Sequence, residues 1–411
     1  MMAGALFLMT GCSADDVVKE TTSEEAIPIS FSCNYDGEPE QPTRAGHEGV
    51  MNTEDLYATG FGVMASVTAN NDPEDPGYAG ANKPNLMYNQ EVEFTFVGDR
   101  EELIDPEHTE LGVKKGYWSY SPLKYWPTSL EHCYISAYAP YVDPTYLTGL
   151  SEEDLAKETG IIGISENSDP PYVDYRRCEK PDKMVDLLWY YKNYGANDKI
   201  PGIGTADAGI LNMKMRHALA RLEIKVALAE TPDPVTTKVL IEKITLTGKM
   251  AKTGRLHLYK QTTEGSGNDI KYYPVWSNQT YDKDEHGDDT DHKFEITNID
   301  NDSESYGIID AQVRYIPGMP YSWQPAGLQV YNPSAPEGTD NGMRNALSTG
   351  GKIGYIYLIP LGTLSLTVKV KYHKMTAGSD EVKIKTADTP ITISPFYGNI
   401  PYSLNLTLSN I

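Results

Sequence analysis

The sequence predicts an all-β protein, and three features of its 411 residues carry that prediction. Tyrosine is abundant, with 29 residues against 7 phenylalanines, and tyrosine favours strands and half-exposed sheet faces. The 35 glycines and 27 prolines are spread along the chain, as expected for many turns. Residues 402–411 alternate apolar and polar side chains, which is the pattern of a strand with one buried face.

Length and charge limit the function classes. A chain of 411 residues suits two domains better than one. The formal net charge is -23, and phosphate binding depends on clustered Lys and Arg, so nucleic acid is excluded as an expected partner. After the N-terminus no apolar run reaches the roughly 18–20 residues that a spanning helix needs. We interpret the acidity as the solvation of a surface protein.

The N-terminus predicts export and lipid attachment. An apolar run ends at Gly11-Cys12, and the stretch from Leu8 to Cys12 fits a lipobox, in which the Cys12 thiol would carry the lipid. The segment before it lacks the Lys or Arg of an ordinary signal peptide; a start codon placed too late and a chance match are the alternatives. Residues 13–16 resemble an acidic surface-export signal, with an ordinary solvated linker as the alternative. Residues 13–25 have no apolar period and are expected to be a flexible tether.

The first half contains strand patterns separated by polar loops. The first, Ile27–Cys33, alternates at period two and is isolated by the loop 34–51, which carries Arg44 and Ala45. Residues 151–159 predict one or two helical turns, and residues 194–208 are rich in Gly, Asn, Asp and Pro, as at a domain boundary. The remaining strands are expected at 57–67, 86–96 with 117–120 as a hairpin, 134–141 and 184–191.

The second half repeats this pattern. Residues 211–226 alternate for most of their length and predict one long strand, although their Ala, Leu, Arg and Glu are also helix formers. Residues 278–291 and 331–349 predict long polar loops. Further strands are expected at 238–247, 254–258, 294–299, 311–315, 354–359, 364–373 and 402–411. The predicted partition is a signal and lipobox at 1–12, a tether at 13–25, and two β-sandwich domains at 26–208 and 209–411.

No motif predicts catalysis or a cofactor. The sequence lacks GxSxG, HExxH, P-loop and Rossmann patterns. His217 is expected to be a hydrogen-bonded structural residue at the domain junction. The acidic run 282–292 could hold Ca²⁺ through its oxygens, but it does not match an EF-hand, and a solvated loop is the favoured interpretation. The tryptophans are expected to pack in cores or interfaces, with a sugar platform as the alternative; they are Trp118, Trp126, Trp189, Trp276 and Trp323.

The four cysteines form no CxxC pair, so a zinc or thioredoxin-type site is not predicted. If Cys12 carries lipid, the other three allow at most one intrachain disulfide. Isolated buried thiols are the favoured interpretation for Cys33, Cys133 and Cys178.

Three motifs, in this order, resemble the fimbrillin (Mfa-like) family of Bacteroides-type type V pili. They are Ser121–Pro127 followed by Ile135–Pro140, and Met215–Leu222, and the lipobox and Thr43-Arg44-Ala45 fit the same pattern. The resemblance implies two tandem transthyretin-like (Greek-key) β-sandwiches. It also implies export as a lipoprotein and cleavage at Arg44–Ala45 by an Arg-specific or trypsin-like protease.

Cleavage would release the strand that carries Ile27, Ile29 and Phe31, and a neighbouring subunit's strand would fill the vacated groove. The C-terminal strand is expected either to be a donor of this kind or to complete the second domain; its apolar residues are Tyr402, Leu404, Leu406 and Leu408.

The sequence therefore predicts a non-enzymatic pilus subunit that supports adhesion, anchored in the outer membrane before it enters the fimbrium. Expected partners are other pilus subunits, outer-membrane lipid, a processing protease, and host or bacterial surface glycans or proteins. No cofactor or metal is expected. The alternatives are a surface lipoprotein that binds glycans without polymerising and, less favoured, a glycoside-acting enzyme, which would need paired carboxylates.

Overall fold

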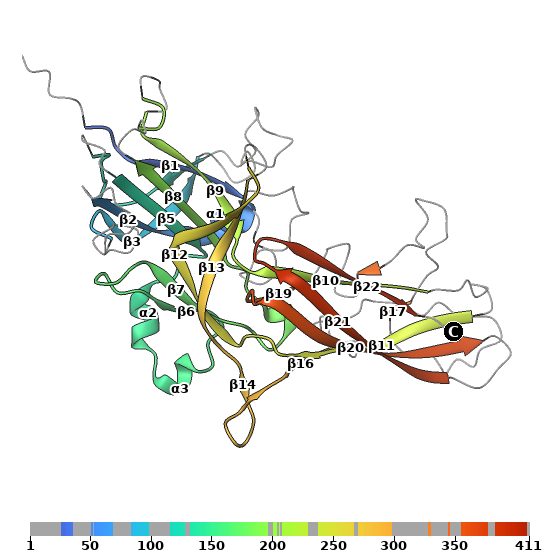
Figure 1. Ribbon diagram of the computed structural model, residues 1–411. Helices are drawn as coiled ribbons and strands as arrows, with labels where there is room; N and C mark the ends of the chain where they lie inside the picture. Colours follow the sequence, from blue (N-terminus) through green and yellow to red (C-terminus); the bar gives the residue numbers. More distant parts are fainter. Residues whose placement is uncertain are drawn as a thin grey trace, which may run out of the picture.

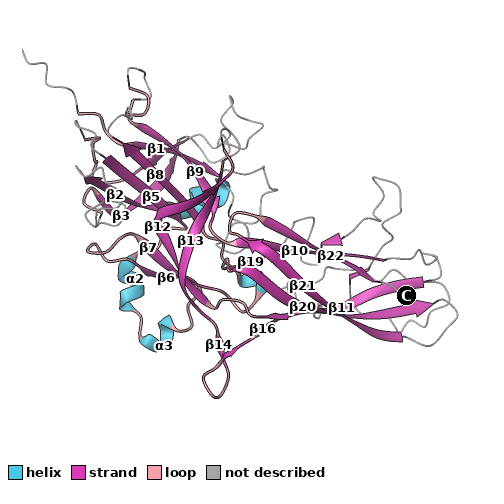
Figure 2. Ribbon diagram, in the orientation of Figure 1, coloured by secondary structure: helices cyan, strands magenta, loops and turns pink. Residues whose placement is uncertain are grey.

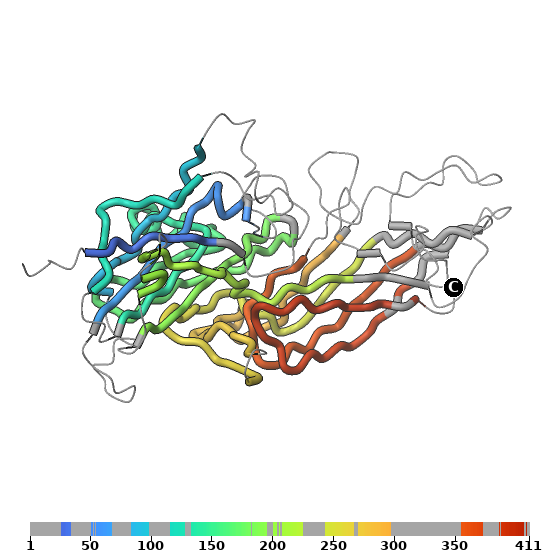
Figure 3. Tube along the Cα trace, turned by 90° about the horizontal axis from the view of Figure 1, so that it is seen from above, coloured from blue at the N-terminus to red at the C-terminus, as the bar shows by residue number. Residues whose placement is uncertain are grey.

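In the computed structural model, strands make up most of the regular secondary structure among the described residues and the helices are few (Figure 2), so the all-β prediction is confirmed. It describes residues 26–35, 51, 53–68, 84–97, 116–127, 132–195, 200–203, 205, 208–228, 237–266, 270–297, 328–329, 344–345, 355–376 and 383–408. The chain runs from one end of the molecule to the other. The N-terminal half lies at one end and the last strands lie at the other (Figures 1 and 3).

The first sheet has seven strands in the order β1-β9-β8-β5-β2-β3-β4. All neighbours are antiparallel except β1 and β9, which are parallel. The strands are β1 (Ser30–Tyr35), β2 (Phe61–Thr68), β3 (Met87–Phe96), β4 (Gly116–Ser119), β5 (His132–Ala139), β8 (Leu188–Gly195) and β9 (Ile210–His217).

The second sheet joins strands from both halves of the chain, in the order β13-β12-β7-β6. β12 pairs antiparallel with β7, so strands from after residue 209 share a sheet with strands from before residue 208. The partition at 208 and 209 stays a prediction. The strands are β6 (Gly160–Ile164), β7 (Tyr172–Arg176), β12 (Thr253–Glu264) and β13 (Lys271–Thr280).

Two further sheets lie at the C-terminal end. In one, β10 pairs with β18 and β19 and also with β22; in the other the order is β16-β11-β20-β21, and β17 pairs with β11. The strands are β10 (Ala220–Leu228), β11 (Thr237–Gly248), β16 (His292–Thr297), β17 (Leu328–Gln329), β18 (Arg344–Asn345), β19 (Ile356–Leu358), β20 (Gly362–Thr376), β21 (Lys383–Phe396) and β22 (Pro401–Leu408).

The helices are short. α1 (Thr53–Thr59) precedes β2, and the 3₁₀ turn η3 spans Pro181–Lys183. α2 (Pro144–Gly149) begins at Asp143, whose side chain accepts from the Thr145 N–H, and α3 (Glu152–Leu155) begins at Ser151. Each such oxygen satisfies one backbone donor that a helix start leaves unpaired.

Two apolar cores hold these sheets together. The first lies on one face of the seven-stranded sheet, and the second joins the other face to the remaining sheets. Leu211, Met213 and Met215 of β9 belong to the first core, whereas Leu222 and Ile224 of β10 belong to the second. β9 and β10 follow each other in the chain but lie in different sheets, so one stretch of chain contributes to both cores.

The structure corrects several local predictions. Residues 53–59 are helical, so the strand predicted at 57–67 begins only at Phe61. The strand predicted at 211–226 is interrupted at Ala218 and Leu219, whose backbone groups bond to Leu187 and Asn399. β8 begins at Leu188 rather than Met184. The sequence did not predict β6, β7, β13, β21 or α2, and the strand predicted at 311–315 lies outside the described residues.

Candidate functional site

β1 is an edge strand that pairs with β9 alone in the described part of the chain. The pairing is parallel, from Ser30 opposite Ile210 to Tyr35 opposite Met215. The predicted strand Ile27–Cys33 is therefore present, but its continuous pairing begins at Ser30 and ends at Tyr35. Before Ser30 the segment makes an isolated bridge, between Pro28 and Tyr125. An edge strand can leave a sheet without breaking any other strand pair.

One face of this segment is buried. Ile29, Phe31 and Cys33 are 0%, 6% and 5% exposed and belong to the first core, while Ser32 between them is exposed. Burying Ile29 and Phe31 is worth about 3–6 kcal/mol together. Removing β1 would thus leave an apolar groove, and the β9 backbone from Ile210 to Met215 would lose the partner on that edge.

The opposite edge of the sheet closes onto β1. The Phe31 ring packs edge-on against Phe61, with centroids 5.8 Å apart, and against Tyr120 just after β4, at 5.4 Å. The Tyr120 hydroxyl donates to the Ile29 carbonyl oxygen at 2.8 Å. Burial raises the pKa of Tyr120, although its hydrogen bond with the Lys124 backbone opposes this. The phenol therefore remains a donor at neutral pH.

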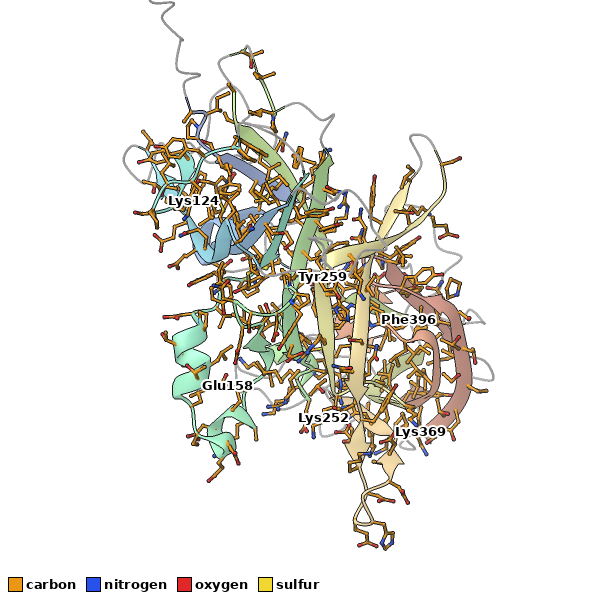
Figure 4. All side chains as sticks on the ribbon, turned by 60° about the vertical axis from the view of Figure 1, so that its left-hand side comes forward. Lys124, Glu158, Lys252, Tyr259, Lys369 and Phe396 are labelled. Carbon is orange, nitrogen blue, oxygen red and sulfur yellow. The ribbon has the colours of Figure 1, made fainter. Side chains whose placement is uncertain are left out.

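Main-chain bonds secure the start of the segment. The Ile29 N–H donates to the Lys124 oxygen at 2.9 Å, and the Trp126 N–H donates to the Ile27 oxygen at 2.9 Å. Figure 4 labels Lys124 at the end of the molecule that holds β1. Residues 121–127 form a recognisable motif in the sequence, but nothing in the sequence indicates that they pair with the first strand.

Gly209 receives the other side of the segment. Its carbonyl oxygen accepts from the Ser30 N–H at 3.1 Å and from the Trp126 indole nitrogen at 3.0 Å. Its φ is +85°, and a Cβ there would lie 2.2 Å from the Pro28 oxygen. Only glycine fits both the backbone conformation and the close approach. Sequence reasoning missed this residue, although it follows the glycine-rich stretch assigned as a domain boundary.

The three described cysteines are free thiols. Cys33 and Cys133 are buried and Cys178 is partly buried, so the isolated-thiol interpretation holds for them in this structure. Burial raises the pKa of Cys33 and raises that of Cys133 to about 12. Both thiols are therefore poor nucleophiles at neutral pH.

The C-terminal strand β22 pairs in parallel with β10, from Pro401 opposite Arg221 to Leu408 opposite Leu228. Leu404, Leu406 and Leu408 are 5%, 6% and 3% exposed, whereas Tyr402 is partly buried. The prediction of one buried face is confirmed. In this conformation β22 completes the core of its own sheet.

His217 lies at the end of β9 in a fully buried polar contact. Its Nδ1 is 2.5 Å from the Asp186 carboxylate, and neither side chain is exposed. The same carboxylate accepts from the N–H groups of Met51 and Leu187 at 3.2 and 2.8 Å. These bonds tie the segment before α1 to β9, which supports the structural role predicted for His217.

The acidic run 282–292 forms a small hairpin, β14 (Asp282–Lys283) with β15 (Asp289–Thr290). Asp282 binds Arg177 at 3.0 Å and His292 at 2.8 Å. Burial alone would raise the pKa of Asp282, but Arg177 and His292 outweigh it and lower that pKa. The carboxylate is therefore already bonded to Arg177 and His292, and the described residues contain no cluster of His, Cys, Asp and Glu side chains that could hold a metal ion.

The four tryptophans in the described residues pack in the interior rather than form an exposed platform. Trp126 and Trp189 are 3% and 0% exposed. Trp118 stacks edge-on against Phe61 at 4.8 Å, and Trp276 is partly buried. Trp323 lies outside the described residues, as do Cys12, Arg44 and Ala45. No helix in the described segments is long and apolar enough to span a membrane.

The fold and this edge define a class of protein: an all-β chain whose first strand is docked at a sheet edge and fills part of a core. No protein-family model matches the chain, and no curated protein matches it in sequence. A fimbrial protein from Bacteroides vulgatus is similar in structure, with a TM-score of 0.51 and 17% identity over 93% of this chain and 95% of that one.

The chain therefore has the fold of a fimbrial protein, as the resemblance implied. Candidate cell adhesion proteins from Bacteroides uniformis and Bacteroides ovatus align over 94% of this chain, with 10% and 11% identity and 94% and 93% of their own lengths covered. Their TM-scores are 0.36 and 0.34, too low to support any conclusion.

Proposed function

We propose that this protein is a structural subunit of a cell-surface pilus, exported as a lipoprotein on Cys12 and assembled by strand replacement. Cleavage after Arg44 separates β1 from the rest of the chain. A strand from another subunit then pairs with β9 and fills the groove. The role is structural rather than enzymatic, and it serves adhesion at the cell surface.

The observation that supports this most is the position of β1. It is the first strand, it lies at an edge, and it contributes Ile29 and Phe31 to a core that is otherwise built from later residues. One cut after Arg44 would separate it from α1 and from every later described element. Contacts that link one subunit to the next without closing produce filaments.

Limited proteolysis tests the proposal. Low-dose trypsin should cut the purified chain after Arg44, and a synthetic peptide with alternating apolar residues should then replace the released fragment. One arm uses residues 26–36 and another uses residues 400–411, which asks whether β22 can act as the donor. Arg44→Ala should block cleavage and uptake, whereas Arg44→Lys should restore cleavage by trypsin but not by an Arg-specific protease.

The proposal fails if the cut chain never takes up either peptide, or if Arg44→Ala leaves oligomer formation unchanged. Binding to a polysaccharide array by the uncut chain, without oligomers after cleavage, would favour a glycan-binding lipoprotein instead.

A further inference from the structure

The loop from Tyr120 to Trp126, called here the clasp, crosses the start of the β1 segment. It follows β4, at the edge of the sheet opposite β1. Its Lys124 and Trp126 backbone groups bond to Ile29 and Ile27, and the Tyr120 hydroxyl bonds to the Ile29 oxygen. The clasp therefore joins the two edges of the seven-stranded sheet through the segment that the proposed function removes.

The two ends of the β1 segment are held differently. Ser30 bonds to Gly209 on one side, and its neighbour Ile29 bonds to the clasp on the other. From Ser32 to Tyr35 the described backbone pairing is with β9 alone. A cut after Arg44 removes the covalent link that follows Tyr35, where the described backbone pairing is on one side, and leaves the start of the segment bonded on both sides.

The clasp makes contacts with the sheet at both ends, and the side chains on its outer side are exposed. Leu123 and Tyr125 are 49% and 47% exposed. At one end the Gln90 amide donates to the Ser121 oxygen at 3.0 Å. At the other end the Trp126 ring is buried and packs edge-on against Tyr194, with centroids 5.3 Å apart. Both ends of the clasp are therefore fixed to the sheet, and the side chains of its middle face solvent.

We propose that the clasp is a retaining strap that keeps β1 docked after cleavage, so that cleavage and strand release are separate steps. This inference rests on the proposed function. Once the chain is cut, β1 loosens from Tyr35 toward Ile29 and stops at the clasp. Release requires the Tyr120 and Lys124 bonds to break, which sets the rate at which the groove becomes available.

Tyr120→Phe tests the strap, because it keeps the ring against Phe31 and removes the hydroxyl that donates to Ile29 and accepts from the Lys124 N–H at 3.2 Å. Tyr125→Phe is the matched control, being the same change in the same loop on an exposed side chain. In the cut full-length chain, the fragment ending at Arg44 should leave about tenfold faster in Tyr120→Phe than in Tyr125→Phe, corresponding to roughly 1.4 kcal/mol.

Amide hydrogen exchange on the uncut chain gives a readout that does not depend on cleavage. The Ile29 amide, which donates to the Lys124 oxygen, should exchange about tenfold faster in Tyr120→Phe than in Tyr125→Phe. The amides of the other strands that line the first core should keep their exchange rates. Equal release and equal Ile29 exchange in the two variants would overturn the strap. If the variants differ but the emptied groove takes up no added strand, the strap stands and the proposed function fails.

Discussion

Phe31 offers the sharpest test of how much the first strand contributes to its groove. The side chain is 6% exposed and contacts the rings of Phe61 and Tyr120. Truncating a buried phenylalanine to alanine costs about 3–5 kcal/mol, from lost transfer energy and the cavity left behind. Since Phe31 leaves with β1, Phe31→Ala should weaken the docking of the fragment rather than the remaining fold.

That cost corresponds to a docking constant weaker by about 100-fold to 4,000-fold. The assay cuts the full chain after Arg44 and follows retention of the fragment by size exclusion and mass spectrometry over a dilution series. Phe96→Ala is the matched control, because Phe96 lies outside β1 and is 44% exposed. Equal retention of the fragment in Phe31→Ala and Phe96→Ala would refute the argument that the buried side chains of β1 stabilise its docking in the groove.

Three further predictions concern the surroundings of the site. Gly209→Ala should lower the unfolding midpoint in denaturant by more than Gly287→Ala, because both have φ +85° but only Gly209 has backbone within 4 Å of the added Cβ. Asp186→Asn should cost about 1–3 kcal/mol of unfolding free energy, because it removes one of the two oxygens that accept buried hydrogen bonds, against less than about 1 kcal/mol for the exposed Asp388→Asn. Burial, with Lys260 and Arg255 nearby, lowers the pKa of His257 to about 4. Between pH 6.5 and 4 the unfolded chain therefore binds more protons than the folded chain, so the free energy of unfolding falls as the pH drops through that window. His257→Gln should flatten this decline, measured by urea titrations at several pH values. Equal losses for the two glycines, equal losses for the two aspartates, or an unchanged slope in His257→Gln would contradict the respective prediction.

Strands in which apolar and polar residues alternate were predictable from the sequence, and strands without this alternation were not. β22 and β20 show clean period-two patterns and form close to the predicted positions. β21 and β13 lack such a pattern because most of their side chains are exposed or partly buried on both faces. β6 and β7 are short; β6 pairs with β7, and β7 pairs with β12, nearly eighty residues later in the chain. Their existence depends on a partner that local sequence does not reveal.

The candidate site divides in the same way. The alternation of Ile29, Phe31 and Cys33 predicts a strand with one buried face, and that face is buried. The sequence did not indicate that Tyr120 and Lys124 bond to this strand, because the contact joins residues that are 91 positions apart in the case of Tyr120 and Ile29. The requirement for glycine at position 209 was also not visible in the sequence, because it arises from the Pro28 carbonyl that approaches this residue in the fold.

By itself, the sequence determined the all-β class, the alternation of the first and last strands, and the absence of known catalytic motifs. These follow from side-chain period and composition, which are local properties. The tertiary structure alone decided that β1 lies parallel to β9 at an edge, that its start is held from two sides, and that β9 and β10 serve different cores. Such features arise from hydrogen bonds and packing between residues far apart in the chain, and each requires the whole fold to bring its partners together.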